Sequence, residues 1–236
     1  MTEEELLQVI EQAAAEGWTE LDLSGNELTV LPPEIGKLTR LKKLVLGKYE
    51  YDEEGRLFDI AGNKLNELPK EIGLLVQLEE LQIARNQLSK LPTQIGQLTN
   101  LQIIDINQNQ LSNLPAEIGK LINLQSLILF NNKLSSLPKE IFQLSNLQSL
   151  YLNFNELNNL PGEIVHLSNL QSLHLSFTKL NNLPAEIFQL INLKSLNLGY
   201  NQLSNLPAEI VKLSNLESLD LSRNGTALRS KIIDCW

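Results

Sequence analysis

A 23-residue repeat runs through most of the chain and constrains its fold more than any other feature. The pattern L-x-x-L-x-L-x-x-N-x-L-x-x-L-P-x-x-I begins at Trp18, Leu41, Leu78, Leu101, Leu124, Leu147, Leu170, Leu193 and Leu216. Successive starts are 23 residues apart, except that the step from Leu41 to Leu78 carries 14 extra residues. One such repeat cannot bury its own leucines, so neighbouring repeats must stack and share a continuous core.

The positions of the repeat divide into a strand side and a turn side. Alternating leucines in L-x-x-L-x-L favour a short strand with one buried face, and successive strands would pair as a parallel sheet. The asparagine at the ninth position, replaced only by Thr178, can satisfy backbone groups where the chain leaves the strand. The proline suits the first position of a short helical turn. We therefore interpret the repeated Leu, Asn and Pro residues as scaffold.

The repeat form with L-P-x-x-I resembles the Ras-suppressor-like class of leucine-rich repeats, which includes many bacterial proteins, over about residues 18–224. This resemblance implies an α/β fold, a curved horseshoe-shaped solenoid of nine repeats. A parallel β-sheet would line its concave face, and short helical or 3-10 turns its convex face. The opening E-L-L-Q-V-I-E-Q-A-A-A-E-G-W-T-E-L-D-L-S-G also resembles the start of the repeat region of bacterial Roco proteins, in which the repeats precede a GTPase module.

The two ends of the chain depart from the repeat. Residues 1–17 are predicted to form a capping helix, because Thr2 and Glu5 have capping-box spacing, an apolar face follows, and Gly17 is a good helix stop. The polar face of this helix is acidic, which disfavours a membrane-surface helix. Residues 225–236 do not continue the pattern, and they form either an irregular cap or a truncated end.

The 14 extra residues lie within residues 47–62 and are predicted to form a β-hairpin. Two strand-like runs, one containing Tyr49 and Tyr51, flank a turn that ends in Gly55. The hairpin should project from one rim of the sheet. It is either a tolerated surface insertion or a contact for a partner. Its acidic cluster lacks the spacing of a calcium loop, so no calcium site is expected.

Function in a solenoid should lie where the repeats differ, at the solvent-facing third, fifth, seventh and eighth positions. In five adjacent repeats these positions are unusually apolar and aromatic, which marks an interaction surface. The predicted site for a protein or peptide partner comprises Ile103, Asp105, Ile128, Phe130, Tyr151, Phe154, His174, Phe177 and Tyr200. The predicted secondary rim comprises Tyr49, Tyr51, Arg85, Asp220 and Arg223.

Four phenylalanines could serve packing within the solenoid instead of binding a partner. Phe154 and Phe177 could turn inward as a stacked spine beside the asparagine ladder. Phe142 and Phe188 follow the isoleucine of the turn side, and we interpret them as packing on the convex side.

The net charge of −9 is concentrated at one end of the chain. Residues 1–80 hold 18 acidic and 8 basic residues, whereas the remainder holds 10 acidic and 11 basic ones. The acidic end either aids solubility or prefers a basic partner. An acidic balance argues against nonspecific nucleic-acid binding, and no apolar run is long enough for a transmembrane helix. We expect a cytoplasmic monomer that does not bind membranes.

Motifs of catalysis are missing from the sequence. It contains no phosphate-binding loop, no G-x-G-x-x-G and no G-x-S-x-G. Cys235 is the only cysteine, and His166 and His174 have no carboxylate at metal or triad spacing. We therefore predict a non-enzymatic interaction module with no cofactor and no metal. The alternatives are the regulatory region of a larger Roco-type GTPase whose catalytic domain lies outside this chain, and a carbohydrate or lipid sensor.

Overall fold

The computed structural model describes residues 1–51 and 57–225, apart from the side chains of residues 50, 51 and 57–60. The chain begins with helix α1 (Glu3–Glu16). The strands are β1 (Glu20–Asp22), β2 (Lys43–Tyr51), β3 (Leu57–Ala61), β4 (Glu80–Ile83), β5 (Ile103–Asp105), β6 (Ser126–Ile128), β7 (Ser149–Tyr151), β8 (Ser172–His174), β9 (Ser195–Asn197) and β10 (Ser218–Asp220). The 3-10 helices are η1 (Pro33–Lys37), η2 (Lys70–Leu74), η3 (Thr93–Gln97), η4 (Ala116–Lys120), η5 (Lys139–Gln143), η6 (Gly162–His166), η7 (Ala185–Gln189) and η8 (Ala208–Lys212).

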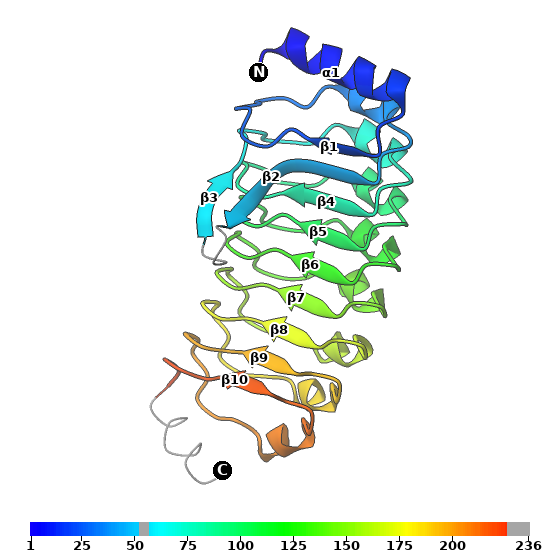
Figure 1. The fold of residues 1–236 in the computed structure, drawn as a ribbon. Coiled ribbons are helices and arrows are strands. Elements are labelled where there is room, and N and C mark those ends of the chain that lie inside the picture. Colours follow the sequence, from blue (N-terminus) through cyan, green and yellow to red (C-terminus); the bar gives the residue numbers. More distant parts are fainter. Residues whose placement is uncertain (52–56, 226–236) are drawn as a thin grey trace.

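Strands β1, β2 and β4–β10 form one parallel sheet in chain order, with a 3-10 helix on the opposite side of each of the first eight repeats (Figure 1). The register aligns equivalent positions, so that Leu127 pairs with Leu150 and Leu150 with Leu173. These leucines are fully buried and belong to one core that extends along the stack. The predicted solenoid, with strands on one face and 3-10 turns on the other, is confirmed.

The asparagine ladder joins each repeat to its neighbours. In the repeat of Asn132, the side-chain Oδ1 accepts a hydrogen bond from the Leu111 N–H at 3.0 Å, and Nδ2 donates to the Ile106 carbonyl at 3.0 Å. The same pair of bonds recurs at the equivalent asparagines, for example at Asn155. At the one departure, Thr178 Oγ1 lies 2.9 Å from the Leu175 carbonyl and 2.6 Å from Asn201 Oδ1, and its single hydrogen can be donated to either acceptor.

The repeated proline lies one residue earlier than predicted. Pro69 and its equivalents in the later repeats are the N-cap residues of the 3-10 helices, and only Pro33 occupies a first helical position. The reason is the hydrogen bonding of a short turn. The carbonyl of Pro69 accepts the first bond, from the Ile72 N–H at 3.1 Å, while the missing N–H of the proline is not needed outside the helix.

Helix α1 covers the first repeat, as the sequence predicted. Thr2 and Glu5 form a reciprocal capping box, and the helix ends at Gly17, which has a left-handed φ of 68°. Leu6, Ile10 and Ala13 are buried in the shared core. The helix thereby removes the apolar end of the stack from water.

The insertion leaves the sheet at the carboxyl end of β2. The first half of β2 pairs with β4, whereas its second half pairs antiparallel with β3 (Figure 1). Gly47 marks the branch point, because a Cβ atom there would lie 1.9 Å from the Ala84 carbonyl oxygen. Glycine alone allows this close approach of two backbones. The Tyr51 side chain and residues 226–236 of the predicted irregular segment 225–236 lie outside the described part of the chain.

Candidate functional site

The eighth position of the repeat holds the backbone in a left-handed conformation where the chain leaves the strand. From the third repeat onward, non-glycine residues with φ between 49° and 56° occupy this position. They are Arg85, Gln108, Asn131, Phe154, Phe177, Tyr200 and Arg223. The left-handed conformation costs a non-glycine residue roughly 1–2 kcal/mol. Hydrogen bonds between repeats hold it in place, such as that from the Phe177 N–H to the Gly199 carbonyl at 3.1 Å.

Three of these residues, Phe154, Phe177 and Tyr200, form a continuous stack of rings, which we call the rim stack. The centroids of Phe154 and Phe177 are 4.3 Å apart and those of Phe177 and Tyr200 are 4.0 Å apart, with nearly parallel planes. The three residues are 48%, 40% and 44% exposed. The alternative that the two phenylalanines turn inward is therefore wrong, because the left-handed turn directs the rings along the outer edge of the sheet.

The fifth position supplies a second row, on the concave face beside the rim stack. Ile128, Tyr151 and His174 are register partners in β6, β7 and β8. Tyr151 and His174 meet edge to face with centroids 4.8 Å apart, and His174 Nε2 lies 3.1 Å from Ser195 Oγ. Partial burial lowers the pKa of His174. This row therefore presents apolar surface together with two polar side-chain ends.

Phe130 has a neighbour that the sequence did not predict. Its ring stacks against Tyr49 of β2, with centroids 5.8 Å apart. Tyr49 therefore lies against the sheet, and the half-buried Phe130 packs under the hairpin. Phe130 thus belongs to a contact within the chain as well as to the predicted surface.

Asp105 in β5 is a partly buried carboxylate at the edge of the predicted site. Burial raises its pKa to about 6, hydrogen bonds from the backbone and side chain of Asn107 oppose this shift, and the negative charge of Glu80 adds to it. The remaining apolar residue on this side, Ile103, is exposed on β5 and is separated from the rim stack by β6.

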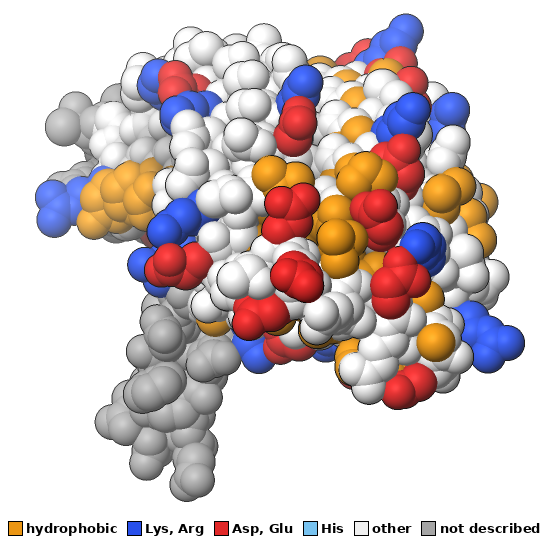
Figure 2. Space-filling model, turned by 90° about the horizontal axis from the view of Figure 1, so that it is seen from above, with side chains coloured by type: hydrophobic (Ala, Val, Ile, Leu, Met, Phe, Trp, Pro, Cys, Tyr) orange, Lys and Arg blue, Asp and Glu red, His pale blue; other side chains and the backbone are white. Residues whose placement is uncertain are grey.

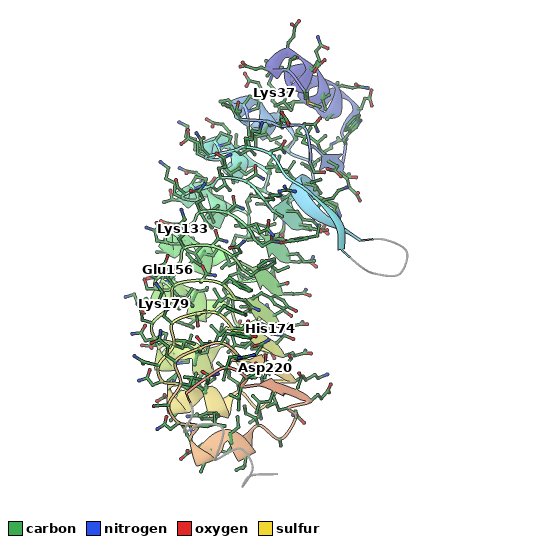
Figure 3. The ribbon with its side chains drawn as sticks, turned by 90° about the vertical axis from the view of Figure 1, so that its left-hand side faces the viewer. Lys37, Lys133, Glu156, His174, Lys179 and Asp220 are labelled. Atoms are coloured by element: carbon green, nitrogen blue, oxygen red, sulfur yellow. The ribbon has the colours of Figure 1, made fainter. Side chains whose placement is uncertain are left out.

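The secondary rim is spread over the length of the sheet. Arg85 and Arg223 are exposed at eighth positions, and Arg223 occupies the repeat after Tyr200. Asp220 is half-buried and accepts a hydrogen bond from the Ser222 N–H at 2.9 Å. Figure 3 shows His174 and Asp220 on one side of the stack, whereas Lys133, Glu156 and Lys179 follow one another along another side.

Phe142 and Phe188 are buried on the turn side, in η5 and η7, as predicted. Sequence reasoning missed a second periodic set of amides, namely the asparagine that directly precedes six repeat starts and the glutamine that follows four of them. Their period of 23 residues was a usable signal.

Within residues 1–51 and 57–225, no cluster of His, Cys, Asp or Glu is arranged to hold a metal ion. The same part of the chain contains no helix that is long and apolar enough to cross a membrane.

Comparison with solved structures shows which proteins share this architecture. An LRR protein of Leptospira interrogans is 40% identical, with a TM-score of 0.63, over 91% of this chain and 63% of that one. The plant peptide hormone receptor RGFR1, solved in complex with RGF2, is 30% identical, with a TM-score of 0.62, over 82% of this chain and 34% of the receptor. Internalin C2 of Listeria monocytogenes shares the fold at 23% identity, with a TM-score of 0.73 and 92% of both chains covered. The chain thus spans less than two thirds of the Leptospira protein and of the receptor.

No sequence among the curated proteins matches the chain. The family description "Leucine rich repeat" matches residues 76–134, 122–180 and 168–225, and a second description of the same repeat matches residues 18–38. Domains of this family and fold typically serve as interaction modules, not as enzymes. The chain belongs to the leucine-rich repeat family.

Proposed function

We propose that this chain binds a protein or peptide partner through the rim stack and the fifth-position row of β6–β8. The observation that carries the proposal is the stacking and exposure of the rings of Phe154, Phe177 and Tyr200. The left-handed eighth position recurs in other repeats, where polar residues such as Gln108 and Asn131 fill it, whereas these three adjacent repeats place stacked rings there that are 40–48% exposed. A contiguous exposed aromatic patch marks an interaction site.

The rim stack has the composition of an interface centre. Exposed aromatic patches mark interaction sites, and buried aromatic anchors contribute about 2 kcal/mol or more each to binding. The rings already support one another, at roughly 0.5–1.5 kcal/mol per pair, so a partner need not immobilise flexible side chains. Tyr151 and His174 lie in the same repeats as Phe154 and Phe177 and offer polar groups beside the stack.

Polar and charged residues lie at either end of the rim stack. Asn131 occupies the eighth position of the repeat before Phe154, and Arg223 that of the repeat after Tyr200. Both are exposed. An apolar centre with a polar margin is the usual anatomy of a protein interface. The similarity to RGFR1, solved in complex with RGF2, supports a peptide or protein as the class of partner.

A triple variant, Phe154→Asn, Phe177→Asn and Tyr200→Asn, tests the proposal. Each change introduces the residue that Asn131 already places at this position, so the left-handed turn is retained. A partner recovered with the wild type is titrated against both proteins, and we expect the variant to bind at least about tenfold more weakly. Val30→Asn with Val211→Asn is the matched control, because it removes exposed apolar side chains elsewhere. Equal affinity of the triple variant and the wild type refutes the proposal.

We also propose that the acidic N-terminal end favours a basic region of the partner. Lysines there already form ion pairs, such as Lys43 with Glu80 at 3.0 Å and Lys48 with Asp22 at 2.7 Å, but acidic residues outnumber them. Figure 2 shows acidic side chains among basic ones at this end. Binding should weaken as salt rises. An affinity that does not change with salt indicates that the charge contributes only solubility.

The alternative that these repeats are the regulatory region of a Roco-type GTPase remains a prediction. It rests on the resemblance of residues 5–25, and none of the contacts described above favours it over an independent binding module.

A further inference from the structure

The opposite edge of the sheet, at the amino ends of the strands, carries a polar groove lined by carboxamides. Its outer row consists of the asparagines that precede the repeat starts: Asn100, Asn123, Asn146, Asn169, Asn192 and Asn215. Its inner row consists of Gln102, Gln125, Gln148 and Gln171. Two adjoining hollows of about 690 and 200 Å³ share Asn123 and Gln125, so the groove continues from Glu79 to Glu217. We call it the carboxamide trough.

The outer row of the carboxamide trough is held in place by the stack. Each asparagine donates from Nδ2 to the carbonyl of the residue 24 positions earlier, as Asn146 does to Ile122 and Asn169 to Ser145, both at 2.8 Å. A carboxamide has two N–H donors and one oxygen acceptor. Each asparagine therefore keeps one donor and the oxygen for a ligand, in an orientation that is already fixed. Such fixed groups lower the entropic cost of binding.

The chemistry of the trough selects among ligand classes. From Asn100 to Gln171 the two rows are uncharged, whereas Glu79 lies at one end of the trough and Lys194 and Glu217 add opposite charges at the other. The trough therefore lacks the basic groove that a polyanion requires. Among the described residues that line it there is no aromatic ring on which a nucleobase could stack. Carboxamides match the donors and acceptors of a peptide main chain, which carries one carbonyl and usually one N–H per residue.

The spacing of the rows favours one peptide conformation. Parallel strands lie about 4.8 Å apart, so two repeats span about 9.6 Å. One turn of polyproline II helix spans three residues, or about 9.3 Å, and leaves its carbonyls free of internal hydrogen bonds. The side chains and carbonyls of an extended β-strand recur with a period of roughly 6.6–6.8 Å. This period matches neither the spacing of adjacent leucine-rich repeats nor twice that spacing.

We propose that the carboxamide trough binds a polyproline II segment of low net charge through its main-chain carbonyls. From the repeat of Glu79 to that of Glu217 there are six intervals, from β4 to β10. These span about 29 Å, or about nine residues of such a segment. The trough and the rim stack lie at opposite ends of three-residue strands, six positions apart, which is about 20 Å along an extended chain. The two sites are therefore separate and can be tested separately.

The test uses decaproline as the probe, titrated into the 15N-labelled protein and followed by the side-chain amide signals. We expect the asparagine and glutamine signals of the trough to shift, while those of Gln143 and Gln189 on the exposed surface of η5 and η7 do not. In a variant with Gln148→Ala and Gln171→Ala, the affinity should fall roughly tenfold. The matched variant Gln143→Ala with Gln189→Ala should bind like the wild type.

Several outcomes overturn the proposal. The first is that Gln148→Ala with Gln171→Ala leaves the affinity for decaproline unchanged, in a variant whose repeat fold circular dichroism has verified. The flexible peptide decaglycine could bind as tightly as decaproline, which contradicts recognition of a preformed helix. Cellohexaose could shift the trough signals while decaproline does not, which assigns the trough to a glycan. None of these outcomes bears on the rim stack, because the two sites are separate. Phe177→Asn, which alters the rim stack, should leave decaproline binding unchanged.

Discussion

Thr178→Asn should stabilise the protein, because it completes the asparagine ladder at its single departure. In six other repeats the ladder asparagine accepts from a leucine N–H 21 residues earlier, as Asn155 does from Leu134 at 2.9 Å. The equivalent donor for Thr178 is the N–H of Leu157, a fully buried residue, and the threonine hydroxyl does not take this role. An asparagine would also donate from Nδ2 to the Leu152 carbonyl, as its counterparts do to the preceding repeat.

The expected gain follows from the hydrogen bonds exchanged. The buried Leu157 N–H gains an acceptor, which removes a penalty of about 1–3 kcal/mol for an unsatisfied donor. The bond from Thr178 to Asn201 is lost, at a cost of about 1 kcal/mol, while Asn201 still accepts from the Leu180 N–H at 3.2 Å. The added bond to the Leu152 carbonyl contributes about 1 kcal/mol and offsets this loss, so the net gain should be about 1–3 kcal/mol. For a protein of this size each 1 kcal/mol raises Tm by about 2–4 °C.

Thermal unfolding of the wild type, Thr178→Asn and Thr178→Ala measures this effect. We expect Tm to rise in Thr178→Asn and to fall in Thr178→Ala, which removes the hydroxyl and its hydrogen bond. Hydrogen exchange adds a local readout, since the Leu157 amide should exchange more slowly only in Thr178→Asn. A Tm of Thr178→Asn equal to or below that of the wild type refutes the reasoning.

Three further predictions concern packing, charge and backbone approach. Gly47→Ala should lower Tm by several degrees, because its Cβ atom would lie 1.9 Å from the Ala84 carbonyl oxygen; an unchanged Tm contradicts the close approach. Asp105 has a pKa of about 6 in the folded state, above its unfolded value, so stability falls as pH rises from about 4 to 6. Asp105→Asn should therefore raise Tm at pH 8 and have little effect at pH 3, and an equal effect at both contradicts the assignment. Phe188→Ala, at a fully buried site, should cost about 3–5 kcal/mol in urea unfolding, clearly more than Phe177→Ala on the surface.

Most of the fold could be predicted from the 23-residue repeat, because each residue of the pattern has the same environment in every repeat. The leucines, the ladder asparagines and the two convex phenylalanines, Phe142 and Phe188, lie where the periodicity predicted them. The proline was misplaced by one residue because the periodicity does not distinguish a cap from a first helical residue.

The candidate site was harder to predict because it depends on geometry that the pattern does not encode. Gly25 and Asn131 favour a left-handed backbone at the eighth position, but Arg, Gln, Phe and Tyr also occur there, so the residue types alone do not specify this conformation. That backbone decides that Phe154 and Phe177 stack outside the sheet. The contact of Tyr49 with Phe130 depends on the direction of the hairpin, which joins residues far apart in sequence. The trough asparagines were visible as a period, but their role needs the carbonyls of the preceding repeat.

The most direct test of the binding proposal is hydrogen exchange of the wild type with and without a saturating recovered partner. The amides of Phe154, Phe177 and Tyr200, which hydrogen-bond to the carbonyls of the next repeat, should exchange more slowly in the complex. Fifth-position residues in the same repeats, such as Tyr151, should be protected with them. Protection confined to the 3-10 helices of the turn side, with unchanged exchange at these amides, contradicts a partner on the rim stack.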